Sequence, residues 1–275
     1  MVRRGLAASR AEAALAVGSG RVLVGGRPAR KSGALVAGAD PIAFTGPTRK
    51  FASRGGEKLE AALDRFAVVV AARSALDAGA STGGFTDCLL SRGASSVVAV
   101  DVGYGQLDWK LRTDPRVSLL ERTNARYLRP EMLPGPPEVV TADLSFISLE
   151  LVVPALAECA ADDADLVLLV KPQFEAGREA VGAGGVVRSR DDRRRAVQRV
   201  AAACRHVGLA VRGVTASPLV GPAGNAELFL WAARPAQDAP GFAEDLERAL
   251  DEAAALSRPS GHGPEPGPPV AGASP

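Results

Sequence analysis

The chain has 275 residues, 47% of them hydrophobic, which is enough for one large domain and a small one with a buried core. It has no apolar run as long as a membrane helix and no signal-peptide pattern, so we expect a cytoplasmic protein without stable membrane insertion. Cys88, Cys159 and Cys204 are far apart in the sequence, which favours buried reduced thiols, and the lack of a C-x-x-C pair argues against a metal site.

The formal net charge of +2 conceals a basic N-terminal region. Residues 1–58 hold eleven Lys and Arg against three acids, so the remainder of the chain is net acidic. This asymmetry is typical of proteins that contact phosphates, although a basic tail that only improves solubility is the alternative. We expect the nucleic-acid contacts to come from Arg3, Arg4, Arg10, Arg21, Arg27, Arg30, Lys31, Arg49 and Lys50.

The first predicted unit, residues 1–45, is a small α+β domain. Ser9–Glu12 reads as a capping box, which predicts a helix that ends at Gly18. The segment Arg21–Val24, which is apolar after its arginine, is followed by the turn Gly25–Pro28 and an extended stretch to Val36. This order predicts a β-hairpin. A helix followed by a hairpin is the pattern of a folded domain, which argues against a basic tail that only improves solubility.

The segment Gly20-Arg21-Val22-Leu23-Val24-Gly25-Gly26, behind a small helix and among basic residues, resembles the alpha-L RNA-binding motif of ribosomal proteins and pseudouridine synthases. That resemblance implies RNA binding by residues 1–45. Because the chain begins within the position of the motif's first helix, we expect a shortened version of the domain.

Residues 46–53 read as a linker, and an amphipathic helix follows through Phe66. Apolar runs then alternate with helical patterns, which predicts an α/β fold with a doubly wound, mostly parallel sheet of seven strands across residues 54–236. The predicted strands are 74–78, 96–100, 117–121, 139–143, 166–170, 211–215 and 228–231, with helices at 148–160 and 191–207. A C-terminal helix over 237–257 and a disordered tail over 258–275 complete the chain.

A glycine-rich turn, Gly79-Ala80-Ser81-Thr82-Gly83-Gly84-Phe85, follows the first of these strands. In such sheets this position holds nucleotide-like ligands. The turn lacks the middle glycine of a dinucleotide fingerprint and the lysine of a P-loop, and acids flank it, so it favours S-adenosylmethionine over phosphate-bearing cofactors.

A second strand ends at Asp101, 22 residues after Gly79, where an acid commonly accepts hydrogen bonds from ribose hydroxyls. Capping or solvation of strand ends is the alternative role for Asp77 and Asp101. The predicted cofactor contacts are Asp77, Gly79, Ala80, Ser81, Thr82, Gly83, Gly84, Phe85, Asp101, Val102, Asn124 and Asp143.

Four charged residues are predicted to meet at the same edge of the sheet. Asp143 and Lys171 end parallel strands, Glu227 begins a final strand that we expect to be antiparallel, and Lys58 precedes the first strand. Partial burial and a second cation nearby both make a lysine a better base. Lys171 could then take the proton of a ribose hydroxyl while the two carboxylates orient the lysines, although each residue alone could be a solvated strand end.

Six motifs together resemble the TlyA (hemolysin A) family of ribosomal RNA methyltransferases. They are Asp77–Phe85, Asp101–Leu107, Glu121–Asn124, Asp143–Ser148, Lys171–Glu175 and Gly224–Glu227. The resemblance implies an FtsJ-like 2′-O-methyltransferase domain with a Lys-Asp-Lys-Glu tetrad at Lys58, Asp143, Lys171 and Glu227. It also implies methylation of cytidine in ribosomal RNA within ribosomal subunits, and sensitivity to capreomycin-type antibiotics.

Three other functions remain as alternatives at this point. The chain could be a non-catalytic RNA-binding or ribosome-assembly factor, a hemolysin-like membrane-active protein, or a methyltransferase that acts on a base or a protein. The basic start of the predicted helix over 191–207, from Arg188 to Arg199, could add phosphate contacts or form a solvated helix face.

Overall fold

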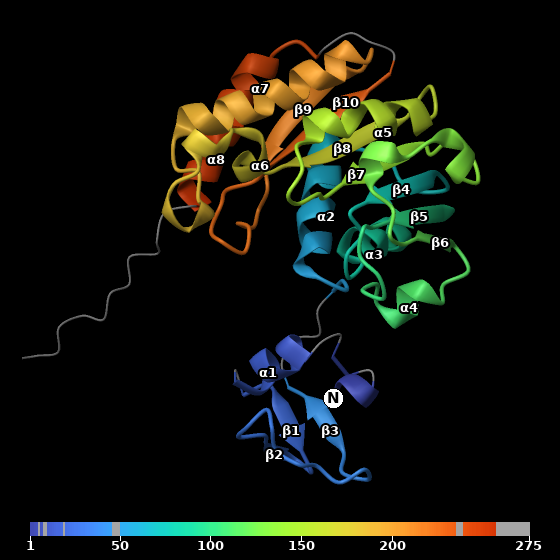
Figure 1. Ribbon diagram of the computed structural model, residues 1–275, viewed down its shortest axis with the longest axis vertical. Helices are drawn as coiled ribbons and strands as arrows, with labels where there is room; N and C mark the ends of the chain where they lie inside the picture. Colours follow the sequence, from blue (N-terminus) through green and yellow to red (C-terminus); the bar gives the residue numbers. More distant parts are fainter. Residues whose placement is uncertain (5, 8–9, 19, 46–49, 235–238, 257–275) are drawn as a thin grey trace, which may run out of the picture.

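The backbone forms two separate sheets, one of three strands and one of seven (Figure 1). This computed structural model describes residues 1–4, 6–7, 10–18, 20–45, 50–234 and 239–256. The predicted α/β class, with a second, smaller α+β unit at the N-terminus, is confirmed. Residues 46–49 of the predicted linker, which include Arg49, and the predicted tail fall outside the described residues.

The small sheet has the antiparallel order β2-β1-β3, with β1 at Val22–Val24, β2 at Arg27–Pro28 and β3 at Ile42–Phe44. Before it lie a 3-10 turn (η1, Val2–Arg4) and helix α1 (Arg10–Gly18). Ala16, Val17 and Val22 form its buried core. Helix α1 ends at Gly18 as predicted, while the capping residue Ser9 lies outside the described residues.

The predicted hairpin is present, but its second strand is shorter than expected. Gly25 and Gly26 have φ values of +57° and +77°, which fits the type I′ turn that closes two-residue hairpins. The strand ends at Pro28 and does not continue to Val36, because the chain turns near Ala34, whose N–H donates to the Lys31 carbonyl. Strand β3, which the sequence did not reveal, occupies the other side of β1.

The predicted site residues follow strands in the middle of the seven-stranded sheet. Its strands are β4 (Ser74–Ala78), β5 (Ser96–Val100), β6 (Val117–Leu120), β7 (Val139–Ala142), β8 (Asp165–Val170), β9 (Ala210–Ala216) and β10 (Leu228–Ala233), in the order β6-β5-β4-β7-β8-β10-β9. Strand β10 runs antiparallel to both of its neighbours, as predicted. The order reverses between β4 and β7, and at such a point a crevice opens beyond the carboxyl ends of the strands.

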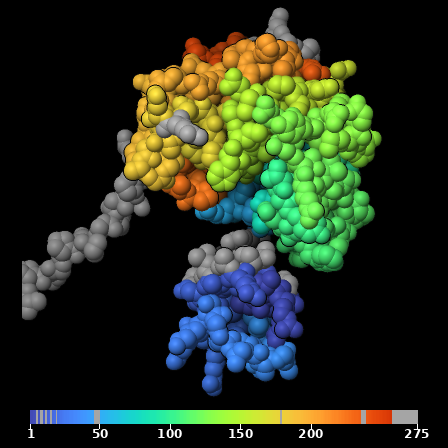
Figure 2. Space-filling model, viewed as in Figure 1, coloured from blue at the N-terminus to red at the C-terminus, as the bar shows by residue number. Residues whose placement is uncertain are grey.

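Helices cover both faces of this sheet. They are α2 (Arg54–Phe66), α3 (Gly84–Ser91), α4 (Trp109–Arg112), α5 (Val153–Cys159), α6 (Pro172–Glu175), α7 (Arg190–His206) and α8 (Phe242–Leu256), with 3-10 turns η2 (Ala125–Tyr127), η3 (Pro130–Met132), η4 (Leu149–Leu151), η5 (Arg178–Ala180) and η6 (Ala183–Gly185). Apolar side chains alternate along the strands: Ala75 faces the core under α2 and α3, whereas Leu76 faces the core under α5, α7 and α8. In Figure 2, the yellow-green and orange segments that include α5 and α7 lie on the surface of the larger unit.

Two helices differ from their predicted extents. The helix predicted over 148–160 is divided into η4 and α5, because Pro154 has no N–H and fits only in the first turn of a helix. Helix α8 begins at Phe242, and residues 237, 238 and 257 of its predicted range lie outside the described residues.

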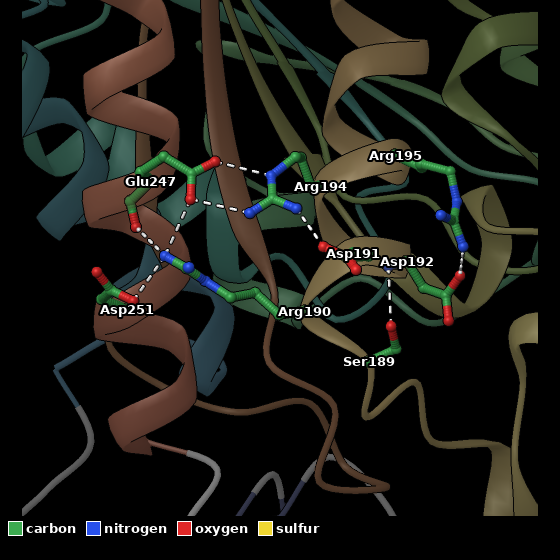
Figure 3. Close-up of polar contacts among 8 residues, drawn as sticks. All are labelled: Ser189, Arg190, Asp191, Asp192, Arg194, Arg195, Glu247 and Asp251. Carbon is green, nitrogen blue, oxygen red and sulfur yellow. Dashed lines mark hydrogen bonds and ion pairs between the residues drawn. The ribbon is translucent and has the colours of Figure 1, made fainter.

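The arginines at the start of α7 bind acids within the protein (Figure 3). Arg194 makes a bidentate contact with Glu247 on α8, at 2.7 and 2.9 Å, and also pairs with Asp191. Arg190 reaches Glu247 and Asp251 of α8 at 3.0 and 2.7 Å. These two arginines therefore dock α8 on α7, while the phosphate contacts considered for them stay a prediction.

All three cysteines are buried, and Cys88 and Cys159 are free thiols, as predicted. Burial raises the pKa of Cys88 to about 12 and that of Cys159 to about 11. No helix in the described part of the chain has the length and apolar character needed to cross a bilayer.

Candidate functional site

A cleft of about 660 Å³ lies at the carboxyl edge of the large sheet, where the strand order reverses. Six segments contribute to its wall: the start of α2, the turn after β4, the loop after β7, α6, the loop that contains Val181 and Gly185, and the turn before β10. The crevice is therefore formed by segments far apart in the sequence, which the parallel sheet brings to one edge.

The glycines of the turn after β4 are required by close contacts. A Cβ atom on Gly79, whose φ is +90°, would lie 2.4 Å from the Asp143 carbonyl oxygen. A Cβ on Gly84 would lie 2.1 Å from Ser53 Oγ, at the start of α2. The turn is thus packed against the loop after β7 and against α2, which leaves its backbone exposed only toward the cleft.

Of the twelve predicted cofactor residues, seven line the cleft: Gly79, Ala80, Ser81, Thr82, Gly84, Phe85 and Asp143. The other five, Asp77, Gly83, Asp101, Val102 and Asn124, are not part of its wall. A Cβ on Gly83 would lie 2.2 Å from Leu111 Cδ1, so this glycine allows α4 to pack beside the turn. Asn124 caps η2 by accepting a hydrogen bond from Arg126 N.

Asp77 lies beneath the glycine turn and is fully buried. Its Oδ2 accepts a hydrogen bond of 2.7 Å from Thr86 Oγ1, while Oδ1 has no partner among the described residues. Burial raises the pKa of Asp77 to about 7, and the Asp143 and Asp101 carboxylates contribute to the rise. The residue therefore supports the turn from below and does not face the cleft.

Asp101 connects two loops at the same edge. Its Oδ2 accepts from Ser81 N at 2.7 Å, in the glycine turn, and its Oδ1 accepts from Gly103 N at 2.6 Å. A carboxylate oxygen has more than one acceptor position, so these contacts leave Asp101 able to accept from a ribose hydroxyl. The acid thus joins the glycine turn to the loop after β5.

The four predicted charged residues form two ion pairs, and all four line the cleft. Lys58 Nζ lies 2.6 Å from Glu227 Oε2, with side chains 10% and 1% exposed. Lys171 Nζ lies 2.6 Å from Asp143 Oδ1. Both lysines and Glu227 are buried, whereas the Asp143 side chain is 24% exposed. Buried charges persist only with good geometry and further hydrogen bonds, so their convergence in one cleft indicates a site for charge and proton chemistry.

Ser145 and Asn225 are site residues that sequence reasoning missed. Lys171 Nζ donates to Ser145 Oγ at 2.9 Å. The buried Asn225 accepts from Val187 N and donates to the Gly185 carbonyl, which fixes the 182–187 loop against the turn before Glu227. Their proximity to Asp143 and Glu227 in the sequence was the available signal.

The basic residues of the small unit are placed differently from one another. Arg4 donates to the carbonyl oxygens of Ala37, Gly38 and Asp40, so its guanidinium supports a turn of the unit itself. Lys50 pairs with Glu60 at 2.6 Å. Arg21 is half-buried, and the predicted RNA-binding side chains exposed on the small unit, besides Arg4, are Arg3, Arg10, Arg27, Arg30 and Lys31.

Comparison with known proteins gives a consistent result. The FtsJ-like methyltransferase family matches residues 51–234. The 16S/23S rRNA (cytidine-2′-O)-methyltransferase TlyA of Mycobacterium tuberculosis is 54% identical over 92% of this chain and 96% of its own length. A Bacillus subtilis protein provisionally named rRNA methyltransferase YqxC is 42% identical over 92% of each chain. A solved structure from Streptococcus thermophilus, provisionally named a hemolysin, has a TM-score of 0.73 at 38% identity and covers 91% of this chain and 93% of that chain.

Proposed function

Because the chain belongs to the TlyA family of FtsJ-like methyltransferases, we propose that it transfers a methyl group from S-adenosylmethionine to the 2′-hydroxyl of a cytidine in ribosomal RNA. The observation that carries this proposal is the pair of lysine–carboxylate contacts in one cleft, Lys58 with Glu227 and Lys171 with Asp143, in which every residue except Asp143 is buried. A binding protein without chemistry has no need to bury three such charges beside a fourth, partly exposed one.

The residues around the glycine turn fit S-adenosylmethionine. The close approach at Gly79 and Gly84 leaves backbone facing the cleft, and the carboxylates of Asp101 and Asp143 lie near the turn. Acids suit a cofactor that carries a sulfonium and an ammonium cation and no phosphate. Gly79–Thr82, Gly84 and Phe85 would hold the cofactor, with Asp101 beside its ribose. When bound, it supplies an electrophilic methyl group.

Lys171 is the proposed base. Asp143 and Ser145 hold its Nζ by contacts of 2.6 and 2.9 Å, which fixes the direction of the nitrogen in the cleft. Lys171 would accept the proton of the 2′-hydroxyl as this oxygen attacks the methyl carbon that the bound cofactor would supply, and the cofactor would leave as a neutral thioether. Lys58, held by Glu227, stabilises the negative charge that develops on the oxygen. Positioning of the reactants supplies much of the remaining rate.

We assign RNA docking to residues 1–45, through the exposed Arg3, Arg10, Arg27, Arg30 and Lys31, and methyl transfer to residues 54–236. Arginine and lysine side chains neutralise backbone phosphates without reading sequence. Ribosomal subunits in the cytoplasm are the proposed partners, because the Mycobacterium tuberculosis and Bacillus subtilis relatives are named as rRNA methyltransferases.

The test is a map of methylation. Ribosomal subunits from a strain without this modification are incubated with the purified protein and methyl-labelled S-adenosylmethionine, and the nucleosides are separated. We expect label in 2′-O-methylcytidine at discrete positions. Label in base-methylated nucleosides, or label only in ribosomal protein, would contradict the proposal and favour the corresponding alternative.

We further propose that this modification confers sensitivity to capreomycin-type antibiotics. Expression of the protein in a host that lacks the modification should lower the inhibitory concentration of capreomycin, and Lys171→Ala should not lower it. Equal sensitivity with and without the active protein would contradict this part of the proposal.

A further inference from the structure

The segment after β8 contains a buried acid that the proposed chemistry does not use. Lys171-Pro172-Gln173-Phe174-Glu175 begins with the proposed base and ends with Glu175, which is only 4% exposed. The two residues stand at opposite ends of the short helix α6. A buried carboxylate needs donors, so its partners indicate what it holds.

Both oxygens of Glu175 bind the loop after β7. Oε1 accepts from Leu149 N at 2.8 Å, and Oε2 accepts from Ser148 Oγ at 2.5 Å. The Ser148 hydroxyl in turn accepts from Glu150 N and caps η4. Burial raises the pKa of Glu175, and these hydrogen bonds oppose that shift.

The loop from Asp143 to Leu149 is therefore held at both ends by one segment, which also contacts its middle, where the rings of Phe146 and Phe174 have centroids 5.3 Å apart. Lys171 contacts its start at Asp143 and Ser145, and Glu175 contacts its end at Ser148 and Leu149. Between these contacts lies Phe146, which has a φ of +65° and a side chain that is 92% exposed. A bulky residue keeps such a conformation only where its surroundings fix the backbone, so the loop is under constraint at both ends.

The residue that carries this carboxylate is itself attached to a fixed element. Arg199 of α7 donates from Nη1 to the Glu175 carbonyl at 3.0 Å. Helix α7 packs in the core on one face of the sheet through Val197 and Val200. Through Glu175, the loop after β7 is thus attached to a helix that is packed in the core.

We infer that Glu175 is a positioning residue for methyl transfer, which keeps the Asp143 carboxylate and the Ser145 hydroxyl in contact with Lys171 by holding the far end of their loop. This inference rests on the proposed function. Release of that end lets the loop move away from Lys171, and a displacement of about 1 Å can lower a rate by about 100-fold.

The test compares Glu175→Leu with Glu175→Gln. Leucine removes both acceptors, whereas glutamine keeps an acceptor for Leu149 N and can donate to Ser148 Oγ. Glu138→Leu is the matched control, because Glu138 also binds two donors, Ser74 N and Ser74 Oγ at 2.8 and 3.0 Å, but stands at the opposite edge of the sheet. Activity is measured well below the melting temperature of every variant.

For Glu175→Leu we expect kcat to fall by about 10- to 100-fold, while the Kd for S-adenosylmethionine stays within about twofold of wild type. Glu175→Gln should retain kcat within about threefold, because it keeps the contacts. The control should keep the kcat of wild type even if its melting temperature falls. Hydrogen exchange of peptides covering residues 144–149 should accelerate in Glu175→Leu, while peptides covering 79–85 are unchanged.

Unchanged kcat in Glu175→Leu, unchanged exchange at 144–149, or equal losses in the leucine and glutamine variants would each overturn the inference. If the leucine variant does not fold, Glu175→Asp takes its place, because it retains the charge but shortens the reach by one methylene. Failure of the proposed function itself is distinguishable, since wild-type protein would then transfer no methyl group, whereas the exchange experiment would still report on the loop.

Discussion

Lys58 Nζ and Glu227 Oε2 are 2.6 Å apart, although 169 residues separate them in the sequence. The contact joins helix α2 to the start of β10, the antiparallel strand, at the wall of the cleft. Since Lys171 has Asp143 as a separate partner, each lysine of the cleft has its own carboxylate. The site can therefore bury two cations without a net charge of its own.

Replacement of Glu227 should lower the stability of the folded protein. Glu227→Leu leaves Lys58 buried without a partner, so the free energy of unfolding should fall by about 3–5 kcal/mol. The double variant with Lys58→Met should be destabilised less than the single variant, because no charge is stranded. Urea unfolding measures both. The control is Glu252→Ala, which breaks an exposed pair with Arg65 and should lower the free energy of unfolding by less than about 1 kcal/mol. An equal destabilisation in Glu252→Ala and Glu227→Leu would contradict the stabilising role of the Lys58–Glu227 pair.

Asp77 should make stability depend on pH. Its pKa rises from 3.8 to about 7 on folding, so the folded state binds the proton more tightly than the unfolded state. Its contribution is fully present below pH 3.8 and is lost as the pH rises through 7. Asp77→Asn, which is neutral at every pH, should lack this dependence. Melting temperatures between about pH 5 and 8 check the difference, and parallel curves for the two proteins would contradict the burial of an acid here.

The strand pattern explains how much of this region was predictable. Side chains alternate between the two faces along β4, so Asp77 lies on the same face as Ala75, toward α2 and α3. This two-residue period could therefore have shown that Asp77 does not line the cleft. The glycine turn and the seven strands followed from their own local patterns. Strand β3 was missed because Ile42–Phe44 is too short to show the alternating pattern of a strand.

The pairing within the site could not be predicted in the same way. The sequence placed Lys58, Lys171, Asp143 and Glu227 at one edge, but which lysine meets which carboxylate depends on rotamers and packing. Glu175 illustrates the same limit. Its motif was visible, yet its partners Ser148 and Leu149 are 27 and 26 residues away, and only the fold brings them together.

The thiols should be chemically inert in the folded protein. The thiolate is the reactive form, and burial holds the pKa of Cys88 at about 12 and that of Cys159 at about 11. We expect no reaction of native protein with a disulfide reagent at about pH 8, and reaction of all three cysteines in about 6 M guanidinium. Rapid modification of one thiol in the native state would show that its surroundings open.

Arg27 and Arg30 should act through phosphates. The Arg27→Ala and Arg30→Ala double variant should weaken ribosome binding, and the slope of log K against log salt should fall by about one for each phosphate that is no longer neutralised. Binding measured from about 50 to 200 mM salt checks this. Arg65→Ala, an exposed arginine on α2, is the control and should leave the slope unchanged. An unchanged slope in the double variant would show that these arginines do not bind phosphate.

The role of Lys171 is the central claim, and single-turnover methyl transfer by Lys171→Ala tests it most directly. Wild-type and variant protein, each saturated with methyl-labelled S-adenosylmethionine, are mixed with unmodified ribosomal subunits. The transfer rate should fall by about 10²–10⁴-fold, the usual contribution of a general base. The Kd for S-adenosylmethionine should change little, because the cofactor is assigned to the glycine turn. Transfer at the wild-type rate with normal cofactor binding would contradict the assignment of Lys171 as the base.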